Sequence, residues 1–127
     1  MTMARKERGF TLVELLVVLA IIATLLSLAA PRYTGSVDKA KESVLRENLF
    51  TLRSTLDKFY GDKGTYPSTL DDLVKQRYLR KIPIDPITDS DTTWVIVAPP
   101  APQKGAVFDV KSGATGTARD GTAYKDW

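Results

Sequence analysis

The sequence predicts an α+β fold in which one long amino-terminal helix packs against a small antiparallel sheet. Three observations support this class: an apolar run of membrane length at residues 10–30, an amphipathic helical pattern at residues 36–60, and two segments near the carboxyl end that are rich in β-branched and aromatic residues. The 127 residues include no cysteine, so the chain must build one modest core without disulfides.

The apolar run FTLVELLVVLAIIATLLSLAA contains one charged residue, Glu14. A helix needs about 20 residues to cross the roughly 30 Å hydrocarbon layer of a bilayer, so the run is long enough to span a membrane. A carboxylate in that layer costs roughly 2.5–3.5 kcal/mol, which marks Glu14 as a functional residue that requires a partner. Arg5, Lys6 and Arg8 precede the run and favour a cytoplasmic amino terminus.

The residues of the run alone leave two other interpretations open. Leu28-Ala29-Ala30 imitates the cleavage site of an ordinary secretory signal, although the run is longer than usual and Pro31 follows at once. A lone membrane anchor whose Glu14 lies near the membrane interface would also have this composition. A lipoprotein anchor is excluded because the chain has no cysteine.

Gly9 followed by FTLVELLVVLAII resembles the class III signal of type IV pilins and pseudopilins, and the resemblance extends from about Arg5 to Tyr33. It implies that residues 1–9 are a leader that is removed. A prepilin peptidase would cleave between Gly9 and Phe10 and methylate the new amino terminus of Phe10. The segment 10–30 would then be the transmembrane and assembly helix.

In this family interpretation, the Glu14 carboxylate pairs with the amino terminus of Phe10 on a neighbouring subunit. Each charge offsets the desolvation of the other, and the pair fixes the axial register of assembly. Further along, Pro31 and Gly35 interrupt the helical pattern. We expect a kink or local melting at Pro31, with a plain boundary between anchor and domain as the alternative.

Residues 31–127 are expected to form a pilin-like globular domain whose first element is the amphipathic helix 36–60. The apolar positions of this helix recur mostly at three- and four-residue intervals, and the charged face opposite is expected to be solvated. The expected apolar positions are Val37, Ala40, Val44, Leu45, Leu49, Leu52, Leu56 and Phe59.

A short helix and two strands are expected after the long helix. Ser68 and Asp71 predict a capping box for a helix that ends near Gln76. Strands are predicted at residues 93–98 and 106–111, and the proline-rich turn between them allows antiparallel pairing. Two strands alone are marginally stable, so they must pack on the long helix.

The pieces GTYPSTLDDLV, YLRKIP and DP resemble, less specifically than the leader does, the major G-type pseudopilin of type II secretion systems. In that family a carboxyl-terminal loop binds calcium, and the SGA, DGT and DW pieces within residues 112–127, the C-terminal loop, resemble a shortened version. The resemblance implies calcium ligands at Ser112, Asp120 and Asp126, completed by backbone carbonyls, because calcium takes six to eight oxygens. A metal-free loop held by Trp127 and turns is the alternative.

The resemblance implies a homo-oligomeric helical filament, the periplasmic pseudopilus that drives protein export. A type IV pilin for adhesion, motility or DNA uptake is the alternative. The expected partners are the prepilin peptidase, the inner-membrane secretion assembly platform and the minor pseudopilins. The subunit would cross the bacterial inner membrane once, with its C-terminal domain in the periplasm.

Neither an enzyme nor a nucleic-acid-binding protein is expected. The chain has no His and no Cys, which excludes a Ser-His-Asp triad, thiol chemistry and His-type zinc sites. Asp85, Asp89 and Asp91 form the only obvious acidic cluster, and a cluster of this kind is usually a solvated turn. Much of the net charge of +3 comes from the leader, so the mature chain has little attraction for nucleic acid.

Overall fold

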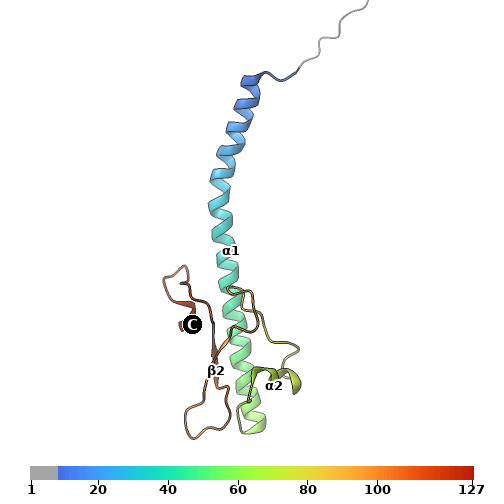
Figure 1. Ribbon diagram of the computed structural model, residues 1–127, viewed down its shortest axis with the longest axis vertical. Coiled ribbons are helices and arrows are strands. Elements are labelled where there is room, and N and C mark those ends of the chain that lie inside the picture. The colour runs from blue at the N-terminus through green and yellow to red at the C-terminus, as the bar shows by residue number, and fades with distance from the viewer. Residues whose placement is uncertain (1–8) are drawn as a thin grey trace, which may run out of the picture. The chain divides into compact units, whose positions relative to one another are not determined.

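The computed structural model describes residues 9–127, without the side chains of residues 30–34. The leader residues 1–8 lie outside this description. The described chain confirms the α+β class, and it divides into two compact units between Val37 and Asp38, beyond the boundary expected at Pro31. Its elements are α1 (Leu12–Lys63), α2 (Leu70–Lys75), β1 (Val95–Val97), β2 (Asp109–Lys111) and the 3₁₀ helix η1 (Tyr124–Asp126) (Figure 1).

The helix α1 continues where the sequence predicts an interruption. It includes both Pro31 and Gly35, so the membrane-length half and the amphipathic half 36–60 form the one long helix of the predicted fold class, which ends at Lys63. A proline inside a helix removes one hydrogen bond, and the intact turns on either side can maintain the helical backbone. The alternative of a helix boundary at Pro31 is therefore wrong, while a kink or local melting there stays a prediction.

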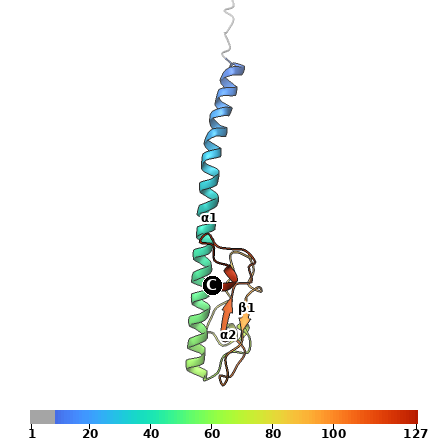
Figure 2. The same cartoon turned by 90° about the vertical axis from the view of Figure 1, so that its left-hand side faces the viewer.

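The core of the second unit, residues 38–127, is built on one stripe of α1. Full burial of each large apolar side chain stabilises the fold by about 1.5–3 kcal/mol. Figure 2 shows α2, the strands and the C-terminal loop on one side of this part of α1. The α1 stripe consists of Leu45, Leu49, Leu52, Leu56 and Phe59, and the covering residues include Leu70, Leu73, Trp94, Val107, Val110 and Tyr124.

The short helix α2 begins one residue later than the sequence predicts. Its capping box joins Thr69 and Asp72: the Thr69 hydroxyl accepts from the backbone N–H of Asp72 at 3.3 Å, and the Asp72 carboxylate accepts from the backbone N–H of Thr69 at 3.2 Å. The predicted pair, Ser68 and Asp71, is therefore wrong by one position. The observed register buries Leu70 in the core.

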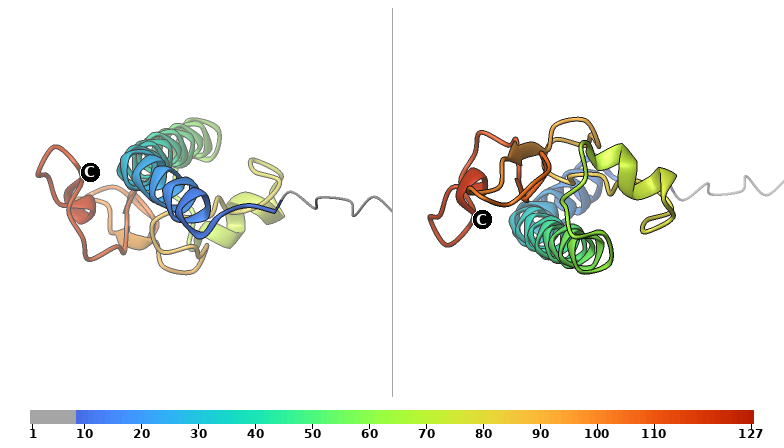
Figure 3. Two further views of the ribbon diagram at one scale, coloured as in Figure 1. Left: turned by 90° about the horizontal axis from the view of Figure 1, so that it is seen from above. Right: turned by 90° about the horizontal axis from the view of Figure 1, so that it is seen from below.

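The two strands pair antiparallel, as predicted, but each is shorter than its predicted range. Ile96 of β1 lies opposite Val110 of β2. Within β2, Val110 is buried whereas Asp109 and Lys111 on either side of it are only partly buried, so the side-chain alternation of β2 turns Val110 to the core. The Trp94 indole before β1 is also buried, and its N–H donates to the Pro83 carbonyl at 2.8 Å. Figure 3 shows the C-terminal loop and α2 at opposite sides of the layer that covers α1.

Asp85 is a buried structural residue and not part of a solvated turn. Its side chain is fully buried, and it accepts hydrogen bonds from the Ile87 N–H at 2.9 Å and from the Ser112 hydroxyl. Asp89 and Asp91 are exposed. The three carboxylates therefore do not share an environment, and Asp85 instead joins the loop before β1 to the segment after β2.

Gly113 provides a test of how closely these segments pack. A Cβ at Gly113 would lie 2.2 Å from the Thr93 carbonyl oxygen, so Gly113→Ala should lower the free energy of unfolding by about 1–3 kcal/mol through overpacking. Chemical denaturation of the full chain in detergent measures this loss. Gly116→Ala is the matched control, because its Cβ would meet the Tyr124 ring at 3.6 Å. Equal stability of both variants would contradict the close approach.

Candidate functional site

The predicted cleavage site lies just before α1. Gly9 and Phe10 lie in irregular backbone before the helix, and Phe10 is 86% exposed. Thr11 caps the helix, since its hydroxyl accepts from the backbone N–H of Glu14 at 3.1 Å. The peptide bond between Gly9 and Phe10 is therefore outside the helix, where a peptidase can reach it.

Glu14 lies in the first turn of α1 and is exposed. A negative charge is favourable at this end of a helix because the backbone N–H groups there lack helical partners. Thr11 already satisfies the Glu14 N–H. Within the described part of the chain, the Glu14 carboxylate has no hydrogen bond or ion pair of its own. It is thus available to a partner on another chain.

The segment Leu12–Ala29 is long and apolar enough to cross a membrane, with a mean hydropathy of 2.7 and no burial against the described chain. Its hydroxyl groups are satisfied within the helix: Thr24 donates to the Ala20 carbonyl and Ser27 to the Ala23 carbonyl, each at 2.8 Å. Apolar surroundings contain no water that could bond these hydroxyl groups, so their hydrogen bonds must be made within the helix. The surface of this segment is suited to lipid or to other apolar helices.

Ser112, the first predicted calcium ligand, is occupied by protein contacts. Its side chain is fully buried. The hydroxyl donates to Asp85 and accepts from the backbone N–H of Ala114 at 3.1 Å. It therefore acts as a link between two segments of the core.

Asp120, the second predicted ligand, is also engaged. One carboxylate oxygen accepts from the Thr122 hydroxyl at 2.6 Å and from the Thr122 N–H at 3.0 Å, and the other lies 3.6 Å from the Arg46 guanidinium. The Thr122 hydrogen bonds, followed by the charge of Arg46, hold the pKa of Asp120 below its usual range. Asp120 is therefore ionised at neutral pH, and its contribution to the loop is lost only as the pH falls through that lowered pKa.

Asp126, the third predicted ligand, is exposed on η1. No group of three or more His, Cys, Asp or Glu side chains in residues 9–127 is placed to hold a metal ion. With Ser112 and Asp120 bonded to protein donors, the three predicted side chains leave most of the six to eight oxygens that calcium takes to backbone carbonyls. The three predicted side chains do not fit a calcium ion in this arrangement.

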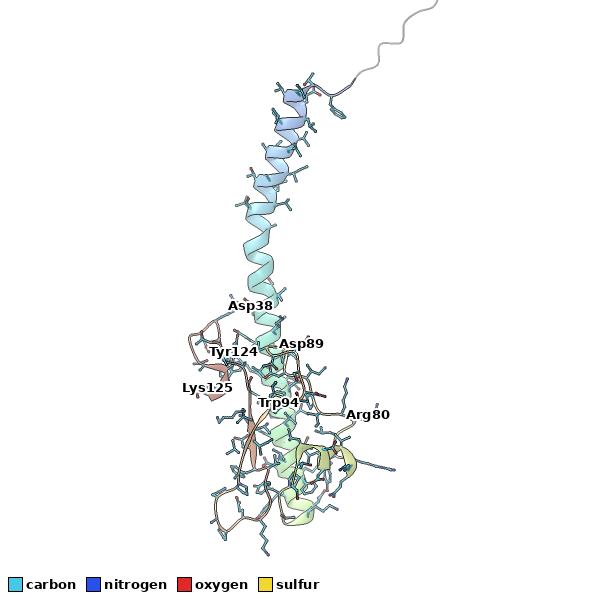
Figure 4. All side chains as sticks on the ribbon, viewed as in Figure 1. Asp38, Arg80, Asp89, Trp94, Tyr124 and Lys125 are labelled. Atoms are coloured by element: carbon cyan, nitrogen blue, oxygen red, sulfur yellow. The ribbon has the colours of Figure 1, made fainter. Side chains whose placement is uncertain are left out.

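The C-terminal loop is instead held by charged residues of α1 that the sequence assigned to a solvated face. Glu42 accepts from the Tyr124 hydroxyl at 3.0 Å and from the Arg119 N–H at 2.8 Å. Figure 4 shows Tyr124 beside α1 and Lys125 toward the outer edge of the loop. Burial and then the Glu42 hydrogen bond raise the pKa of Tyr124, so this hydroxyl remains a donor.

Two arginines of α1 contact the end of the loop. The Arg46 guanidinium lies 4.2 Å from the centre of the Trp127 ring. Arg53 donates to the Trp127 carbonyl at 2.6 Å and to the Asp109 carboxylate at 2.8 Å. The signal in the sequence was the helical spacing of Glu42, Arg46 and Arg53, which places them on one face of α1 where the two aromatic residues of the loop can dock.

Comparison with known proteins identifies the first part of the chain. Residues 4–30 match the model of the prokaryotic N-terminal methylation motif. This range includes Gly9, Phe10 and Glu14. No solved structure is a significant match to the chain.

Curated relatives match a larger part of the chain. Type II secretion system core protein G of Dickeya chrysanthemi is 35% identical over 100 residues, which cover 66% of this chain and 65% of the relative. The protein of that name from Pseudomonas aeruginosa is 34% identical over 98 residues, or 65% of this chain and 69% of the relative. The one from Escherichia coli is 34% identical over 97 residues, or 64% and 67%. Because these identities exceed 30% over about two thirds of each relative, the chain belongs to the family of type II secretion system core protein G.

Proposed function

We propose that the chain is a subunit of a periplasmic pseudopilus, a filament that drives protein export in type II secretion. The observation that carries this proposal is the exposed apolar surface of Leu12–Ala29 on a chain related to core protein G. An apolar helix of this length requires a bilayer before assembly and helices of the same kind afterwards. A helical filament of identical subunits meets the second requirement.

The Glu14 carboxylate would set the register between subunits. An unpaired Glu14 carboxylate among apolar helices would destabilise the filament. The positively charged amino terminus of mature Phe10 is the complementary charge. The Thr11 cap supports this role because it fixes the first turn, in which Glu14 lies, and keeps Phe10 outside the helix. Pairing between subunits satisfies both charges and leaves the cap intact.

Processing and membrane orientation follow from the same segment. The prepilin peptidase would cut after Gly9 and methylate Phe10. Basic leader residues favour a cytoplasmic amino terminus, so residues 38–127 would lie in the periplasm. The inner-membrane assembly platform and minor pseudopilins would then add subunits at the membrane end of the filament.

The subunit would act mechanically and without catalysis of its own. Each added subunit moves the filament outward by one step and transmits force to the exported protein. The most buried polar groups, Asp85 and Ser112, bond one another and neighbouring backbone, which supports a structural role. The relatives' assignment to secretion favours this function over a type IV pilus for adhesion, motility or DNA uptake.

Complementation tests this function in the source bacterium. A strain that lacks the gene should release little exoprotein into the medium, and expression of the full chain should restore release. The measurement is exoprotein activity in the culture supernatant, with a cytoplasmic enzyme as the control for lysis. Restored twitching or DNA uptake with unchanged secretion would contradict the secretion assignment and favour a type IV pilus.

Replacing Gly9 should block maturation. A side chain next to the scissile bond would obstruct the peptidase, so Gly9→Val should accumulate as the longer precursor on a denaturing gel. Gly61→Val is the control for glycine replacement, because a Cβ at Gly61 meets no atom within 4 Å. Normal maturation of Gly9→Val would remove the processing site from the proposal.

Neutralising Glu14 should impair assembly more than folding. Glu14→Gln keeps the size of the side chain but removes the ion pair, so filament yield should fall by about tenfold or more if each pair contributes at least ~1.4 kcal/mol. Filaments are counted by electron microscopy, and membrane insertion is followed by fractionation. Glu47→Gln, an exposed change on α1, should assemble normally. Wild-type yield for Glu14→Gln would contradict the ion pair.

A further inference from the structure

We propose that Arg46 serves as the cation of the C-terminal loop, so that residues 112–127 dock on α1 without a divalent metal ion. This inference rests on the contacts of the loop and is independent of the filament's role in secretion. It departs from the calcium site that the family resemblance implies.

Arg46 contacts the loop in two ways. Its guanidinium lies 3.6 Å from the Asp120 carboxylate and 4.2 Å from the centre of the Trp127 ring. A planar, delocalised cation suits both contacts at once, because it can pair with a carboxylate through its edge and stack on an aromatic ring through its face. A calcium ion, by contrast, is hard and accepts only oxygen ligands, so it would gain nothing from Trp127.

The ligands that calcium would need are already committed. Asp120 directs one oxygen to the two Thr122 donors and the other toward Arg46. The Ser112 hydroxyl is buried against Asp85. A calcium ion would have to displace Arg46 and break these hydrogen bonds before it gained its own oxygens.

Two further α1 residues also contact the loop. Glu42 binds the Arg119 N–H and the Tyr124 hydroxyl, and Arg53 binds the Trp127 carbonyl. The Arg46–Asp120 pair has exposed side chains, so it would be weak alone. Glu42, Arg46 and Arg53 lie on one face of α1 and hold a single loop. Each contact restricts the loop, so the next contact costs less conformational entropy.

A covalently attached cation has a consequence that a bound ion lacks. An ion stabilises the fold according to its free concentration relative to its Kd. Arg46 is always present and always charged. The docking of the loop, and with it the stability of the subunit, should therefore be the same in calcium and in chelator.

Limited proteolysis of the full chain in detergent micelles tests this inference. Trypsin cleavage after Lys125, an exposed loop residue, is followed by mass spectrometry in millimolar calcium chloride and in EGTA. The wild-type rate should be equal in the two buffers. Arg46→Gln should raise the cleavage rate about five- to tenfold in both, because cleavage follows the population of the undocked loop. Arg46→Lys, which keeps the charge but loses the planar stack, should be intermediate.

Arg80→Gln is the matched control, since Arg80 is an exposed arginine outside the loop contacts and should leave the rate unchanged. The melting temperature of the wild-type chain in calcium and in EGTA is a second measurement that needs no variant. Slower cleavage or a higher melting temperature in calcium would overturn the inference, as would a wild-type cleavage rate for Arg46→Gln. Loss of filaments with calcium-independent docking would instead count against the proposed function.

Discussion

The whole structure depends on one constraint: α1 carries apolar surface in two different settings, and each must be covered. Along Leu12–Ala29 the described chain covers none of it, so lipid or other copies of the helix must do so. Within residues 38–127, the chain's own later segments cover the stripe from Leu45 to Phe59. The sequence differs to match, because a continuous apolar run suits surroundings that are apolar on all sides, and three- and four-residue spacing suits one covered face.

The elements with a strong local pattern were predictable from the sequence. The membrane-length run, the stripe of α1 and the antiparallel strands all follow from hydrophobic periodicity and turn residues. The start of α2 could not be predicted from the sequence, because Ser68 and Thr69 are both good capping residues and the burial of Leu70 decides between them. At Pro31 the sequence alone left a helix boundary open as an alternative to one long helix. The helix continues because proline removes one hydrogen bond and the adjacent turns can maintain the backbone.

The polar contacts of the second unit were the least predictable part. Asp85 and Ser112 are 27 residues apart, and Glu42 and Arg119 are 77 apart. No local pattern reports such pairs, so the charges of α1 were assigned to solvent by default. In the structure they hold the C-terminal loop on the helix that also includes the apolar segment Leu12–Ala29. The proposed cleavage and assembly residues stay predictions, and they lie within a few positions of one another, where a local sequence motif can indicate them.

The central claim is that Glu14 of one subunit pairs with the amino terminus of Phe10 on the next. A filament reconstruction by cryo-electron microscopy, at a resolution that shows side chains, measures this pair directly. The Glu14 carboxylate should lie within about 4 Å of the Phe10 nitrogen of a neighbouring subunit, the usual limit for an ion pair. A Glu14 carboxylate that contacts only the amino terminus of its own chain, or no cation at all, would contradict the account.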